Sequence, residues 1–76
     1  MNENKLAREK AIQQIKEVIY DLQIGASEIM PARQTPLTYS VRFDNRAGRP
    51  EEVLVRGAAT YREIYMALKA AHDRRR

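Results

Sequence analysis

A chain of 76 residues, with 14 Lys and Arg against 10 Asp and Glu and with no cysteine, has room for one small domain and excludes disulfide bonds, cysteine-ligated metals and thiol catalysis. No apolar run approaches the ~18 residues that cross a bilayer, and the charged N-terminus lacks the hydrophobic core of a signal peptide. We therefore expect a cytoplasmic protein without a membrane segment, in which residues 1–76 form a single domain with residues 1–3 and 74–76 frayed.

The first predicted element is an amphipathic helix over residues 4–24. Apolar side chains recur there at three- and four-residue steps, as one face of a helix requires. At 1.5 Å per residue this helix would be about 30 Å long, against about 18 Å for the second helix, so we expect it to extend past its own domain. An unpartnered apolar stripe of this kind predicts a homodimer. The predicted dimer interface consists of Ile12, Ile15, Ile19 and Leu22, and pairing of two chains through a strand edge stays open as an alternative.

A connector follows over residues 25–36, because glycine and proline interrupt regular structure there. We expect Gly25 to end the first helix. We expect residues 27–30 to form one helical turn before Pro31, with their apolar side chains closing the end of the core.

Residues 37–44 and 51–56 predict an antiparallel β-hairpin. Apolar and polar side chains alternate along both segments, which is typical of strands with one buried face. The segment between them is rich in residues that tolerate tight bends, so we expect a turn there. The buried face is predicted to carry Leu37, Tyr39, Val41, Phe43, Val53 and Val55, whereas Thr38, Ser40, Arg42, Leu54 and Arg56 face outward.

The last predicted element is a helix over residues 60–73, which opens with Thr60 and Glu63 at the spacing of a capping box. Two amphipathic helices and one hairpin with an apolar face predict an α+β fold, a two-layer helix–strand–strand–helix module whose hairpin packs under both helices. This order resembles that of double-stranded RNA-binding domains, which have a third strand and a lysine-rich start to the last helix. The sequence predicts neither feature, so we assign no family.

Residues that could carry catalysis are scarce. The single histidine, His72, lies near the end of the last helix, and no serine or threonine has a base predicted beside it. One histidine without cysteine cannot supply a metal site, and Gly25, Gly48 and Gly57 are too far apart to form a phosphate-binding loop. We expect no enzyme, no cofactor, no metal and no small-molecule substrate.

Positive charge is concentrated in the second part of the chain. Residues 1–28 carry four bases against five acids, a net of −1, whereas residues 29–76 carry ten bases against five acids, a net of +5. Nine of these ten bases are arginine, whose planar fork suits phosphate and carboxylate. The first hypothesis is a non-enzymatic regulator that binds nucleic acid through an arginine-bearing hairpin face and a basic C-terminus. Its predicted contacts, to nucleic acid or to an acidic partner, are Arg33, Arg42, Arg46, Arg49, Arg56, Arg74, Arg75 and Arg76.

Two alternatives stay open. Exposed arginines are also what an ordinary solvated surface carries, and basic residues at the end of the last helix also complement its dipole. The second functional hypothesis is a protein–protein interaction module, an inhibitor or adaptor of the kind that phages and mobile elements encode. Such a module would dock onto a larger assembly through the first helix or an open sheet edge.

Overall fold

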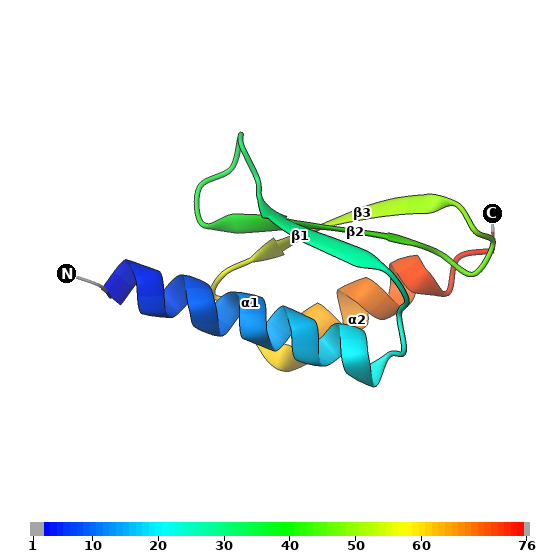
Figure 1. Cartoon of the computed structure of the whole chain (residues 1–76), viewed down its shortest axis with the longest axis horizontal. Helices are drawn as coiled ribbons and strands as arrows, with labels where there is room; N and C mark the ends of the chain where they lie inside the picture. Colours follow the sequence, from blue (N-terminus) through cyan, green and yellow to red (C-terminus); the bar gives the residue numbers. More distant parts are fainter. Residues whose placement is uncertain (1–2, 76) are drawn as a thin grey trace.

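The computed structural model describes residues 3–75, and for residues 3–5 the backbone only. It contains two helices and a three-stranded antiparallel sheet, so the predicted α+β fold is confirmed and gains one strand. In chain order the elements are α1 (Glu3–Asp21), β1 (Ser27–Pro31), β2 (Thr38–Asp44), β3 (Pro50–Arg56) and α2 (Tyr61–His72). Both helices lie on the same face of the sheet, and nothing in the described part of the chain forms a helix on the other face (Figure 1).

The sheet is a meander in the order β1-β2-β3, with β2 in the centre. Ile29 of β1 lies beside Val41 of β2, which in turn lies beside Val53 of β3. Neighbours in register share a face of the sheet, so these three side chains form one row toward the helices. Arg42 and Leu54 belong to the opposite, uncovered face and are exposed.

The core lies between the helices and the sheet. Its fully buried side chains are Ile15 and Val18 from α1, Val41 from β2 and Leu68 from α2. Burying an aliphatic side chain of this size contributes about 1.5–3 kcal/mol, so the contact between the three elements supplies much of the stability of so short a chain. This contact is what positions the loops and turns at the two ends of the sheet.

Two of the four residues predicted for a dimer interface belong to this core. Ile15 and Ile19 are 0% and 9% exposed within the single chain, so they have no surface to offer a second copy. Ile12 and Leu22 are partly buried against the same core. Dimerisation itself stays a prediction, and an interface on α1 has to use other side chains, such as Tyr20, which is 82% exposed.

The segment predicted as a helical turn, residues 27–30, is instead part of strand β1. It pairs with β2 along its whole length, because the central strand would otherwise leave a row of backbone N–H and C=O groups without partners. Pro31 has no N–H and stands at the end of this edge strand, where a proline is tolerated. With β1 the element order becomes helix–strand–strand–strand–helix, so the structure contains a third strand that the sequence analysis did not predict.

The end of α1 also differs from the prediction, because Gln23 rather than Gly25 forms its cap. Gln23 adopts the left-handed conformation at φ +57° and donates its N–H into the last turn of the helix. The N–H of Ile24 reaches back to the carbonyl of Ile19 at 3.0 Å. These two bonds make a Schellman motif, whose apolar pair here is Ile19 and Ile24, both buried.

Leu37 does not join the buried face, contrary to the prediction. It precedes β2, is 79% exposed and has a left-handed backbone at φ +55°. Tyr39, Val41 and Phe43 of β2 are buried as predicted. The core-facing positions predicted for β2 are therefore confirmed and Leu37 lies outside the strand, but Thr38 and Ser40, which were expected to face outward, are only 7% and 4% exposed.

The predicted capping box of α2 is present. The N–H of Glu63 donates to Oγ1 of Thr60 at 3.2 Å, and the N–H of Thr60 donates to Oε1 of Glu63 at 2.9 Å. The Thr60 backbone and side-chain groups lower the pKa of the Glu63 carboxyl, because they interact with its charged form.

The two ends of the chain were predicted to be frayed, and the structure describes only some of these residues. Of the residues expected to be frayed, 1, 2 and 76 lie outside the described residues, whereas Arg74 makes an ion pair with Glu51 at 2.9 Å. Over residues 3–75, neither helix has the length and apolar character needed to cross a membrane.

Candidate functional site

The turn between β2 and β3 is organised by one buried side chain, Asn45, which is 5% exposed. Its Oδ1 accepts the N–H of Ala47 at 2.8 Å and the N–H of Arg49 at 3.0 Å. The carbonyl of Asn45 accepts the N–H of Gly48 at 2.9 Å, and Gly48 takes φ +76°, a conformation that glycine adopts without steric cost. The turn is therefore a rigid base for the arginines at positions 46 and 49.

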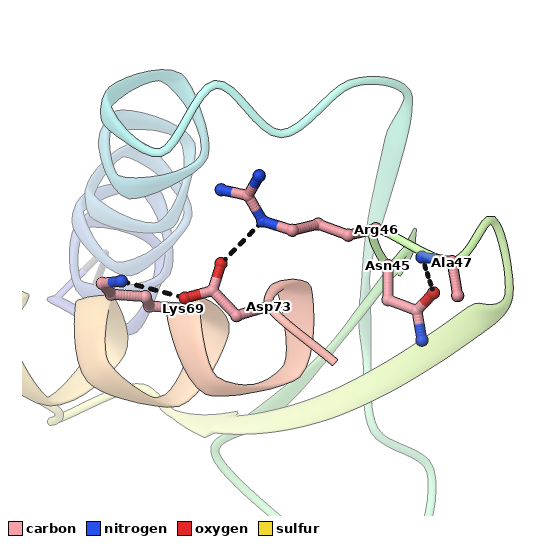
Figure 2. Close-up of polar contacts among 5 residues, drawn as sticks. All are labelled: Asn45, Arg46, Ala47, Lys69 and Asp73. Atoms are coloured by element: carbon pink, nitrogen blue, oxygen red, sulfur yellow. Dashed lines mark hydrogen bonds and ion pairs between the residues drawn. The ribbon is translucent and has the colours of Figure 1, made fainter. Parts of the chain in front are cut away.

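This turn is attached to the C-terminal end of α2. The backbone N–H of Arg46 donates to the carbonyl of His72 at 3.0 Å, which satisfies one of the carbonyls that a helix end leaves without a partner. Nε of Arg46 donates to Oδ1 of Asp73 at 2.9 Å, and Nζ of Lys69 donates to Oδ2 at 2.9 Å (Figure 2). The Lys69 amine and the Arg46 guanidinium hold the pKa of the Asp73 carboxyl below its ordinary value.

A second ion pair ties the C-terminal segment to β3. Nη1 of Arg74 donates to Oε1 of Glu51 at 2.9 Å, while Nδ2 of Asn45 donates to Oε2 of the same carboxylate at 2.7 Å. The Glu51 side chain is only 13% exposed, so its charge is held mainly by these two donors. The turn, the start of β3, the end of α2 and the residues after it thus form one connected surface. We call it the hairpin end, and it consists of Asp44, Asn45, Arg46, Arg49, Glu51, Lys69, Asp73, Arg74 and Arg75.

The remaining predicted site residues lie elsewhere. Arg42 is on the uncovered face of β2, in register with Glu28 of β1 and Glu52 of β3. Its Nε donates to Glu52 at 3.2 Å, and the Ser40 hydroxyl donates to the same oxygen at 2.6 Å. Ser40 and then Arg42 lower the pKa of the Glu52 carboxyl. This row carries two acids for one base, so the uncovered face around Arg42 has a net negative charge.

Arg33 and Arg56 lie at the other end of the sheet. Arg33 is in the loop between β1 and β2, and Arg56 is the last residue of β3. A strand of seven residues spans about 20 Å, which separates Arg56 from the hairpin end by that length. The structure therefore brings together four of the eight predicted arginines. Arg76 lies outside the described residues.

Sequence reasoning missed three residues that hold the hairpin end together: Asn45, Glu51 and Asp73. Asn45 has a local signal, since asparagine at the start of a turn accepts hydrogen bonds from N–H groups two or more residues ahead. Asp73 follows Lys69 by four residues, the spacing of a helical ion pair. Glu51 has no local signal, because its partner Arg74 is distant in sequence.

The described charged side chains of the hairpin end are bases and the acids that orient them. The ring of His72 lies 6.2 Å from the ring of the buried Phe43, so it packs at the edge of the core. Within residues 3–75, no three side chains of His, Cys, Asp or Glu are grouped so as to hold a metal ion. No family model, curated protein or solved structure matches the chain.

Proposed function

We propose that this protein is a non-enzymatic, cytoplasmic regulator that binds the phosphate backbone of nucleic acid through its hairpin end. One observation carries the proposal. The hairpin turn and the basic C-terminus, far apart in sequence, are joined by the bond from the Arg46 N–H to the His72 carbonyl and by the ion pair between Arg74 and Glu51. Fixed cations on one rigid surface are what phosphate contacts require.

The charge of the hairpin end favours an anionic partner. The bases there are Arg46, Arg49, Lys69, Arg74 and Arg75, and the acids are Asp44, Glu51 and Asp73, an excess of two bases (five less three). The excess positive charge is the source of an affinity that would fall as salt rises.

The guanidinium groups also keep donors for a ligand. Among the described residues, neither Arg49 nor Arg75 has an ion-pair partner, and both are exposed. Arg46 contacts Asp73 through Nε alone, and Arg74 contacts Glu51 through Nη1 alone. A guanidinium has five N–H donors, so each paired arginine is oriented by an acid and still able to bind a phosphate oxygen.

The experiment is a fluorescence anisotropy titration against duplex DNA, double-stranded RNA and single-stranded RNA over a series of salt concentrations. The variant Arg49→Ala/Arg75→Ala removes two unpaired bases, so the slope of log K against log salt should fall by about 1.8 for duplex DNA, at about 0.9 per phosphate contact. The control is Arg8→Ala/Arg56→Ala, which removes the same charge at the other end of the sheet. Equal losses in both variants would refute a localised contact, and no binding of any probe at low salt would reject the function.

A second candidate function, an adaptor or inhibitor that docks onto a larger protein, is favoured by exposed apolar side chains. Leu37 is 79% exposed, and Leu54, on the uncovered face of the sheet, is 58% exposed. A pull-down that returns one partner in stoichiometric amount and no nucleic acid would favour this function over the first.

A further inference from the structure

An apolar groove lies at the end of the sheet away from the hairpin turn. Its apolar walls come from Ala7 of α1, Pro36 and Leu37 of the β1–β2 loop, and Ala58, while Arg8 and Arg56 stand at its margin. None of the described residues that line it is acidic, and its volume of about 460 Å³ lies within the ordinary range for ligand sites. A surface of this kind suits a ligand that is apolar in one part and negatively charged in another.

The backbone at this groove is held in an unfavourable shape. Leu37 has φ +55°, a conformation that is unfavourable for a residue with a Cβ, and its side chain is 79% exposed, so burial compensates for little of this strain. The conformation is fixed by the N–H of Gly57, which donates to the Leu37 carbonyl at 2.8 Å, and by the Thr38 hydroxyl, which donates to the Pro36 carbonyl at 3.1 Å. Strain at an exposed apolar side chain is an observation that points to function.

Gly57 allows the end of β3 and the β1–β2 loop to lie close together at the base of the groove. A Cβ at this position would lie 3.3 Å from the Leu37 carbonyl oxygen and 3.7 Å from the Tyr39 ring. With a larger residue the Leu37 carbonyl would have to move by a few tenths of an ångström, at the bond that holds Leu37 in place. The groove therefore depends on a close approach of two backbone segments.

We propose that this groove binds a peptide segment of a partner protein, with an apolar side chain between Leu37 and Ala58 and a neighbouring carboxylate on Arg8 and Arg56. Arginine binds carboxylates in a bidentate manner, and both guanidinium groups lack an ion-pair partner in the described part of the chain. This inference specifies the docking surface of the second candidate function and does not depend on the nucleic-acid proposal.

The walls of the groove favour a peptide over a nucleobase. Binding of an unpaired base relies on an aromatic face for stacking, and among the described residues that line this groove the one aromatic, Tyr39, is 6% exposed. Phosphate groups would satisfy Arg8 and Arg56 but leave the apolar walls of Leu37 and Ala58 in water. An acidic peptide with an apolar anchor fills both parts.

The test is an NMR titration of the ¹⁵N-labelled protein with two acetylated hexapeptides, Glu-Asp-Leu-Phe-Asp-Glu and Lys-Lys-Leu-Phe-Lys-Lys, up to millimolar concentration. We expect the acidic peptide to shift the amide signals of Ala7, Leu37, Gly57 and Ala58, and the basic peptide to leave them unchanged. In Arg8→Ala/Arg56→Ala the dissociation constant should rise about tenfold or more, while the hairpin-end variant Arg49→Ala/Arg75→Ala serves as the matched control and should bind normally.

A second variant separates binding from folding. Leu37→Asn keeps a residue that tolerates the left-handed backbone and removes the apolar wall, so the melting temperature should hold or rise while peptide affinity falls. Shifts that cluster at Leu54 instead would overturn the groove and leave the docking function standing. Equal binding of both peptides, binding of neither, or shifts at the groove with duplex nucleic acid alone would also overturn the inference.

Discussion

Gln23 is the position where a single substitution should make this protein more stable. Its backbone lies at φ +57° as the residue that closes the Schellman motif of α1, a position that glycine normally occupies. A residue with a Cβ loses about 1–2 kcal/mol in this conformation, whereas glycine loses almost nothing. Glycine also makes the unfolded chain more flexible, which lowers the free energy of unfolding by about 0.4–1 kcal/mol and offsets part of the gain. We expect Gln23→Gly to raise the free energy of unfolding by about 0.5–1 kcal/mol.

The assay is thermal and urea unfolding followed by circular dichroism. For a domain of this size a gain of 1 kcal/mol raises the melting temperature by about 4–8 °C, so Gln23→Gly should gain about 2–8 °C. The matched control is Gln13→Gly, the same chemical change at an exposed position in the middle of α1. It should lower the free energy of unfolding by about 0.5–1 kcal/mol, because glycine is a poor helix former.

The prediction is supported if the free energy of unfolding rises in Gln23→Gly and falls in Gln13→Gly. A destabilised Gln23→Gly protein would show that the left-handed cap is not formed in solution. It would also remove the physical basis for ending α1 ahead of Gly25.

Four further predictions concern the core, the turn, the ion pairs and the hydrogen bond between Tyr61 and Asp21. Ile15→Ala should cost about 2–5 kcal/mol out of a total of about 4–11 kcal/mol and leave much of the chain unfolded in urea titrations at low denaturant. Asn45→Ala removes the acceptor of two turn N–H groups and a donor to Glu51, so it should cost about 1–3 kcal/mol, measured in the same way; an unchanged midpoint would contradict the turn geometry. The pKa of Asp73 is lowered from 3.8 in the folded state, so near this pH the folded state binds fewer protons than the unfolded state. The ion pairs of Asp73 therefore stabilise the fold above pH 3.8, and this contribution is lost as the pH falls through the folded pKa. In Asp73→Asn the decrease of the melting temperature at acidic pH should be smaller than in the unchanged protein. The Asp21 carboxylate accepts a hydrogen bond from the Tyr61 hydroxyl and raises the pKa of Tyr61 to about 12, so one phenolate absorbance step near that pH should vanish in Tyr61→Phe.

The predictable parts of the fold have their causes within a few neighbouring residues. The periodicity around Ile15 and Val18 predicts α1, the alternation of Tyr39, Val41 and Phe43 predicts β2, and the pair Thr60 and Glu63 predicts the start of α2. Each of these signals acts over three or four residues, so it can be read along the chain. The α+β class follows from their order.

The site was predictable only in part. The hairpin turn and its arginines were expected, and so was a basic C-terminus. The contact between the turn and the C-terminal residues could not be predicted from local sequence. The partner of Arg46 is Asp73 and the partner of Arg74 is Glu51, and these lie 27 and 23 residues away in sequence. Nothing in the local sequence distinguishes an arginine that meets an acid of its own chain from one that meets a ligand.

The sequence by itself determined which segments are helical, which alternate as strands and how much positive charge the second half carries, because propensity, periodicity and charge are properties of neighbouring residues. The tertiary structure alone decided that residues 27–31 form a strand, that Gln23 caps α1 and that Leu37 stands in solvent. Residues 27–31 form a strand because they pair with the backbone groups at the second edge of β2. Leu37 is exposed because its carbonyl accepts a hydrogen bond from the N–H of Gly57, which is 20 residues away in sequence. Contacts between distant segments set these features, and their energy outweighs the local preferences of the residues involved.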